Sequence, residues 1–110
     1  MFKSLKLYSS LRIDSDGLLG VLVNFGYKNQ QAVAEEGDFS HRGGIVDIFP
    51  TGFEYPIRIE LDSDAINSIH SFEISKGKNI WPHQIVIILP FKRRASKSEL
   101  DFTEEIPLSN

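Results

Sequence analysis

Residues 37–50 read GDFSHRGGIVDIFP, which is two strand-sized segments joined by a pair of glycines. The first segment, 39–42, follows a turn at residues 35–38, and the second, 45–49, is almost continuously apolar. Pro50 closes the second segment, because proline has no backbone N–H to donate to a ladder. Gly43 and Gly44 predict a bulge or tight bend where another part of the backbone approaches closely. The stretch therefore predicts two short strands connected by a bend.

Downstream of this stretch, the chain continues in strand-sized pieces. Apolar and charged residues alternate over residues 57–62, which predicts a half-buried strand with Arg58 pointing to the open face, where Glu60 or Glu73 could pair with it. Residues 66–74 predict a further strand, and the different parity of Ile66 and Ile69 predicts one bulge within it. Residues 85–89 are five consecutive aliphatic side chains before a proline, which predicts a strand buried on both faces.

A helix is predicted upstream of the strands. The short polar side chains of segment 14–16 each carry an oxygen that can accept a hydrogen bond from the free N–H groups of a first helical turn. Gly26 follows the last helical turn, at the position where a residue with left-handed backbone conformation commonly ends a helix. The apolar stripe at helical spacing comprises Leu18, Leu19, Leu22, Val23 and Phe25.

One helix followed by closely spaced strands predicts an α+β fold, in which the helix packs on one face of a curved, mostly antiparallel sheet. We expect residues 1–90 to form the domain and residues 91–110 to be a flexible tail or linker stub, because the tail is highly charged and has little to bury. The predicted core comprises Leu19, Leu22, Val23, Phe25, Phe39, Ile45, Ile48, Ile57, Ile59, Ile69, Phe72, Ile85 and Ile87.

The composition sets limits on function. A chain of 110 residues that is 41% hydrophobic and 25% charged has material for one core. Twelve Lys and Arg stand against fifteen Asp and Glu, and the net charge of −3 argues against non-specific binding to DNA by the whole surface. The absence of cysteine excludes disulfides, thiolate zinc sites and thiol nucleophiles. No segment approaches the roughly 18 apolar residues of a membrane span, so we expect a soluble cytoplasmic chain without cofactor or metal.

Residues 37–50, followed by EYPIRIE at 54–60, resemble the hallmark of the UvrB interaction domain. This is the UvrA-binding module that excision-repair UvrB shares with the transcription-repair coupling factor. Residues 18–27 and 66–72 also look like the family, and the resemblance covers roughly residues 7–90. The motif positions to which we assign structural roles are Gly37, Phe39, Gly43, Gly44, Asp47, Phe49 and Pro50.

The resemblance implies a partner surface. In the family the module is an insert in a motor protein that docks onto UvrA, and in the coupling factor it also takes part in an autoinhibitory contact. The expected partner is therefore a UvrA-like protein or another domain of a longer parent chain. Arg42 and Arg58 fall on family arginines that contact UvrA, whereas Asp62 replaces one of the paired aromatics often found there and His70 replaces a family arginine. We expect the partner surface to include these four residues and Glu60.

The chain lacks the motifs of a motor or ATPase. It contains no G-x-x-x-x-G-K-[ST] loop and no acidic Mg²⁺-binding box, so we expect no enzyme activity. Strong direct binding to nucleic acid is not expected either. Two other interpretations remain open, namely a nucleic-acid-binding domain that uses Arg42, Arg58 and the segment 92–94, and an inactive fragment of a larger coupling factor.

Overall fold

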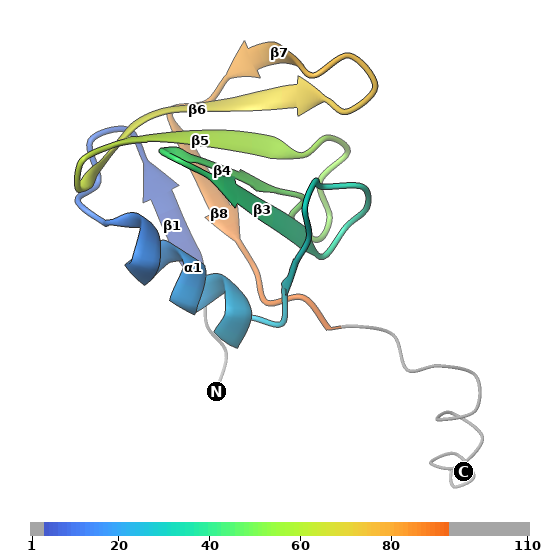
Figure 1. The fold of residues 1–110 in the computed structure, drawn as a ribbon, viewed down its shortest axis with the longest axis horizontal. Coiled ribbons are helices and arrows are strands. Elements are labelled where there is room, and N and C mark those ends of the chain that lie inside the picture. The colour runs from blue at the N-terminus through green and yellow to red at the C-terminus, as the bar shows by residue number, and fades with distance from the viewer. Residues whose placement is uncertain (1–3, 93–110) are drawn as a thin grey trace, which may run out of the picture.

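The computed structural model describes residues 4–92 (Figure 1). This part of the chain contains one helix, α1, and eight strands, and it confirms the predicted α+β class with a mostly antiparallel sheet. The elements are β1 (Leu5–Tyr8), α1 (Ser15–Asn24), β2 (Lys28–Asn29), β3 (Asp38–Arg42), β4 (Ile45–Ile48), β5 (Ile57–Asp62), β6 (Ala65–Glu73), β7 (Lys78–Pro82) and β8 (Ile85–Ile88).

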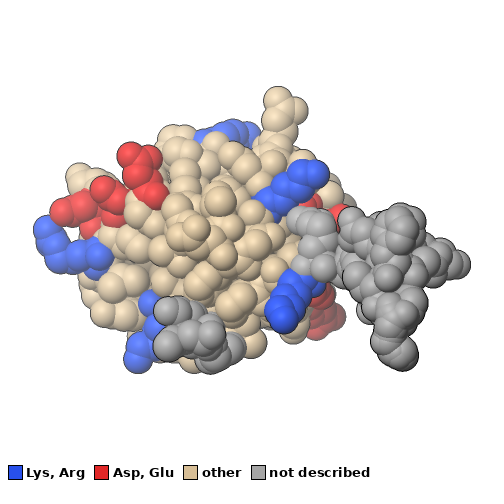
Figure 2. Space-filling view, turned by 90° about the horizontal axis from the view of Figure 1, so that it is seen from below, with Lys and Arg blue, Asp and Glu red and all other residues tan. Residues whose placement is uncertain are grey.

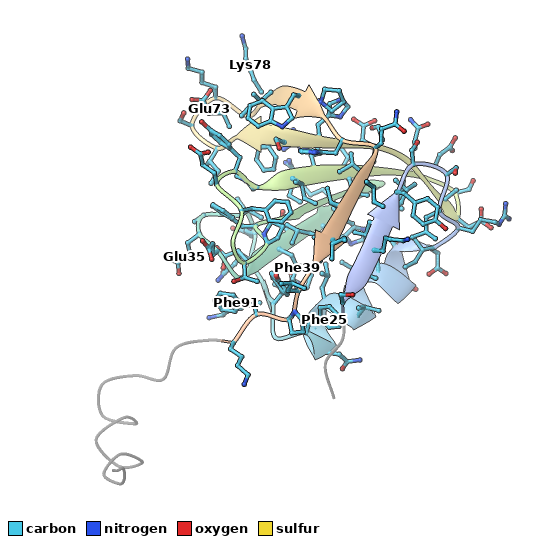
Figure 3. All side chains as sticks on the ribbon, turned by 180° about the vertical axis from the view of Figure 1, so that it is seen from behind. Phe25, Glu35, Phe39, Glu73, Lys78 and Phe91 are labelled. Atoms are coloured by element: carbon cyan, nitrogen blue, oxygen red, sulfur yellow. The ribbon has the colours of Figure 1, made fainter. Side chains whose placement is uncertain are left out.

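The strands form two sheets. The larger has six strands in the order β2-β3-β4-β5-β6-β7, and only its β2–β3 pairing is parallel. The first and last strands, β1 and β8, form a separate antiparallel pair, which we call the ribbon. The ribbon lies behind the larger sheet in Figure 1 and in front of it in Figure 3, while α1 runs below both. Three elements thus enclose one core.

The predicted bend between β3 and β4 is a two-residue hairpin turn. Arg42 pairs with Ile45 in the ladder, and Gly43 between them has a φ of 58°. A Cβ on Gly44 would lie 2.8 Å from the carbonyl oxygen of Leu61, and the Leu61 N–H donates to the Gly44 carbonyl at 2.7 Å. This contact confirms the close backbone approach predicted from the glycine pair.

The core lies between the inner face of the larger sheet, α1 and the ribbon. Leu18 and Leu22 of α1 are fully buried, and the helix begins as predicted, with an Asp14 carboxylate oxygen accepting from the Gly17 N–H at 2.8 Å. The buried apolar residues are Leu7, Leu18, Leu22, Tyr27, Val33, Phe39, Val46, Ile48, Ile57, Ile59, Ile66, Ile69, Phe72, Val86 and Ile88. Within the described residues no helix has the length and apolar character needed to span a membrane.

Three predictions about burial were wrong. Ile45, predicted in the core, is half-buried and pairs with Glu60, so it lies on the face of β4 opposite the buried Val46 and Ile48. In β8 only Val86 and Ile88 are buried, whereas Ile85 and Ile87 are about half exposed at 49% and 51%. The reason is that β8 belongs to a two-stranded ribbon that covers the core with one face, rather than to the middle of a covered sheet. Val23 is 59% exposed, because it lies one residue beyond Leu22 and so about 100° further around the helix. Seen from below, where α1 lies in Figure 1, the molecule carries charged side chains at the margins and none at the centre of the view (Figure 2).

The bulge predicted between Ile66 and Ile69 is present. Glu60 pairs with Ser68 and Leu61 with Ile66, so that Asn67 is the extra residue in β6. The sequence did not predict β1, β2 or β7, which are short or largely polar, and β7 is exposed along its whole length.

Phe91 fastens the C-terminal end of the described chain to the domain. Its N–H donates to the Phe25 carbonyl at 2.8 Å, and its ring lies 5.7 Å from that of Tyr27. Phe25 and Phe91 lie at the same end of the domain (Figure 3). A Cβ on Gly37 would lie 2.6 Å from the Phe91 ring, and a Cβ on Gly26 only 2.3 Å from the Phe91 carbonyl oxygen. Both glycines have a φ of 94°. Phe91, which the sequence placed in the tail, is therefore partly buried against the core.

We predict opposite effects for two Gly-to-Ala substitutions. Gly26→Ala should lower the free energy of unfolding by more than about 1 kcal/mol, because it combines a left-handed φ with a backbone clash. Gly20→Ala should raise it by about 1 kcal/mol, since Gly20 lies within α1 with nothing within 4 Å of its added Cβ. Urea denaturation of both variants measures these changes, and equal effects would contradict the proposed role of Gly26.

Candidate protein-interaction surface

The cross-strand register brings the predicted partner residues onto one face of the larger sheet. Directly opposite residues of antiparallel strands share a face. One row runs through Ser40, Asp47, Arg58, His70 and Pro82, and the next runs through Arg42, Ile45, Glu60 and Ser68. Asp62 follows Glu60 at strand spacing and lies on the same side. We call this side, which is opposite the core, the outer face.

Arg58 is held within the domain. Its Nε donates to Asp47 Oδ1 at 2.8 Å and its Nη2 to Asp47 Oδ2 at 2.9 Å, while the side chains are 19% and 8% exposed. Its guanidinium carbon lies 4.5 Å from the centre of the Phe72 ring, in cation–π geometry. Hydrogen bonding to Asp47 raises the pKa of Arg58, outweighing the opposite effect of burial.

Arg58 lies on the outer face, as the alternation predicted, but its partner differs from the prediction. The partner is Asp47, which lies directly opposite on β4, rather than Glu60 or Glu73. Two of the three guanidinium nitrogens are occupied by the carboxylate, and the third, Nη1, lies 3.5 Å from the Gly77 carbonyl oxygen. Arg58 thereby connects β4, β5, β6 and the β6–β7 turn, so it shapes the outer face more than it offers a free cation.

Arg42 has the opposite character. It ends β3, is exposed, and forms no ion pair with any described residue. It borders a hollow of about 690 Å³ formed with His41 and residues 29–32. Asp62 is also exposed, whereas Glu60 and His70 are half-buried. The outer face thus carries one freely available guanidinium beside two carboxylates and an imidazole.

The remaining motif residues hold β3 and the end of β4 in place. The Gly37 N–H donates to the Phe49 carbonyl, and the Phe49 N–H donates to the Asp38 carbonyl, both at 2.9 Å. Phe39 and Pro50 are buried. Sequence reasoning missed Asp38, whose buried carboxylate accepts from the N–H groups of Ala34 and Glu35 at 3.0 Å each. An Asp after a turn was the available signal, because such residues bond nearby backbone amides.

The described residues of the outer face form no cluster of metal ligands, and Ser40 and His41 are not paired as a nucleophile and a base. Among residues 4–92 no three His, Asp or Glu side chains gather to hold a metal ion. Ser40 is buried while its neighbour His41 is exposed and bonds to the Gly43 carbonyl at 2.8 Å. What the arrangement can do is present charged and hydrogen-bonding groups to another surface.

Residues 5–93 match the family described as the UvrB interaction domain. The chain belongs to this family. Among curated proteins, it is 37% identical over 97 residues to the transcription-repair-coupling factor of Bacillus subtilis (strain 168), covering 81% of this chain and 8% of that protein. It is 53% identical over 67 residues to the transcription-repair-coupling factor of Staphylococcus aureus (strain USA300), covering 61% of this chain and 6% of that protein. This UvrB interaction domain therefore spans less than a tenth of the length of these relatives.

The two arginines should respond differently to substitution. We predict that Arg58→Ala lowers the free energy of unfolding of this UvrB interaction domain by about 2 kcal/mol or more, because it leaves the buried Asp47 carboxylate without its counter-ion. Arg42→Ala should change it by less than about 0.5 kcal/mol, since Arg42 is exposed and makes no ion pair with the described residues.

Chemical denaturation of the single variants and of Arg58→Ala combined with Asp47→Ala tests the pair. The double variant should lose less stability than the sum of the two single changes. Additive losses, or an Arg58→Ala variant as stable as the parent, would contradict a stabilising role for this contact.

Proposed function

We propose that this UvrB interaction domain is a DNA-repair module that binds a UvrA-like protein through its outer face and has no ATPase or motor activity of its own. The observation that carries the proposal is Arg42, an exposed guanidinium without an ion-pair partner among the described residues. The other residues expected at a partner surface lie on the same face.

The two arginines support this function in different ways. An arginine presents a planar fork of donors that suits carboxylates and is enriched in interface hot spots. Arg42 is available to pair with an acidic group of the partner, whereas Arg58 is already committed to Asp47. Arg42 therefore supplies the direct contact, and Arg58 keeps the surrounding strands in place.

The names of the relatives support a role in repair. Both proteins named above are transcription-repair-coupling factors, and each is far longer than the region shared with this chain. Activities of such a whole protein need not reside in this module. We infer that the module contributes a docking surface in the cytoplasm, either to a separate UvrA-like protein or to another domain of a longer parent chain.

Calorimetric titration of the 110-residue chain into purified UvrA tests the proposal. We expect saturable one-to-one binding that weakens with added salt, because the contact is partly electrostatic. Arg42→Ala should weaken binding about tenfold or more, as expected for an interface arginine. The matched control is Lys6→Ala, which removes an exposed cation from the ribbon, and it should bind like the parent.

Other outcomes would redirect the interpretation. If Arg42→Ala binds as tightly as the parent, the outer face around Arg42 is not the contact surface. If the folded chain does not bind UvrA but retains DNA on a filter at low salt, the nucleic-acid interpretation replaces this one. If it binds neither, the chain is an inactive fragment.

A further inference from the structure

A cavity of about 280 Å³ opens near the partner residues and is not explained by the contacts above. It is formed by residues 67–70 of β6, Pro82 at the end of β7, the next two residues, 83–84, and Ser9. The β6 segment includes the bulge residue Asn67 and the outer-face residues Ser68 and His70. The cavity therefore lies at one end of the row that contains Arg58.

Two polar atoms of the cavity residues lack a partner. Ser68 Oγ and His70 Nδ1 are shielded from solvent and form no hydrogen bond with the described residues. Such atoms are unusual in folded proteins, because burial without a hydrogen bond is costly. Both residues line the cavity, and rotation about χ1 of Ser68 or a flip of the His70 ring would turn each group towards it. A group bound in the cavity would supply the missing partners.

The lining of the cavity indicates which chemical group fits. It includes no carboxylate, and it includes two imidazoles, the hydroxyls of Ser9 and Ser68 and the amides of Asn67 and Gln84. His83 is engaged with Ser71 Oγ at 2.7 Å, and burial, followed by the charge of His70, lowers the pKa of His83. Hydroxyl, amide and imidazolium groups all donate hydrogen bonds. A donor-rich lining without an acid is suited to a carboxylate.

None of the charged groups around His70 contributes a carboxylate to the lining of the cavity. Arg58 lies directly opposite His70 on β5, but its charge is paired with Asp47. Glu60 lies opposite Ser68 and does not line the cavity. His83 approaches from the segment after β7. Among these neighbours, Glu60 is the competing acceptor that a test must exclude.

We propose that this cavity receives the carboxylate of an acidic side chain of the protein partner, with Ser68 and His70 as its hydrogen-bond donors. The inference rests on the proposed function, because the carboxylate is assigned to the partner. The bound carboxylate favours the protonated imidazole and raises the pKa of His70 in the complex. Binding then takes up a proton, so affinity increases as the pH falls from 7.5 towards 6.

The first experiment follows the His70 imidazole by NMR in the 110-residue chain during a titration with sodium acetate. Sodium chloride at equal ionic strength and acetamide, a neutral molecule of similar shape, serve as controls. We expect saturating acetate to raise the pKa of His70 by about one unit, as a close opposite charge does, while both controls leave it unchanged. An equal response to chloride or acetamide would overturn the carboxylate assignment.

Single substitutions test whether acetate binds in this cavity. Ser68→Ala and His70→Gln should each weaken acetate binding about tenfold or more, the loss expected for one hydrogen bond to a charged group. Ser75→Ala and His41→Gln are the matched controls, since both residues are exposed and lie outside the cavity. Glu60→Gln should leave the pKa of His70 unchanged in the absence of acetate. A lowered pKa there would mean that Glu60 is the acceptor and would overturn the proposal.

A second experiment separates the cavity from the proposed function by measuring UvrA affinity at pH 6.0 and 7.5. The parent should bind more tightly at pH 6.0, and His70→Gln should lose that dependence. If UvrA binds with the same affinity at both pH values and acetate has no effect, the proposed function stands and the cavity proposal fails. If acetate binds while UvrA does not bind at any pH, the proposed function fails and the cavity takes a free carboxylate instead.

Discussion

The ion pair between Arg58 and Asp47 is the interaction around which the outer face is organised. Two guanidinium nitrogens bind one carboxylate at 2.8 and 2.9 Å, and the guanidinium rests on the Phe72 ring. The contact spans three neighbouring strands and reaches the turn at Gly77. Since both partners are largely buried, each charge depends on the other to remain there. The position of every other outer-face residue is defined relative to this pair.

The pair also explains why two arginines on one face differ in role. Arg58 lies in the middle of the sheet, where neighbouring strands exclude water and supply an acid directly opposite. Arg42 lies at the last position of β3, beside the glycine turn, where nothing in the described part of the chain covers it. Resemblance to a family assigns both residues the same function, but burial and register separate them. Arg58, in the middle of the outer face, is held by a contact within the domain, whereas Arg42, at its margin, is available to contact a partner.

Much of the fold followed from local patterns, and the failures have physical causes. The glycine pair, the alternation at 57–62 and the parity change before Ile69 specify a turn, a strand and a bulge through short-range geometry. The predicted burial of Ile85 and Ile87 was wrong, because a run of aliphatic residues does not show whether one face of its strand is covered or both. The partner of Arg58 was also missed. Alternation showed which face Arg58 occupies, but only the register of β4 against β5 shows that Asp47 lies opposite.

The charge pattern of the outer face constrains how a partner can approach. Arg42 is a permanent cation at one margin, Glu60 and Asp62 follow along β5, and His70 lies beside Arg58 towards the cavity. A partner that places an acid opposite Arg42 must avoid placing another opposite Glu60 and Asp62, because like charges in contact are unfavourable. Arg58 changes this pattern little, since Asp47 balances it. The alternation of positive and negative charges therefore restricts the orientation of the partner more than it increases the affinity. The cavity beside His70 provides a second contact that restricts the same orientation.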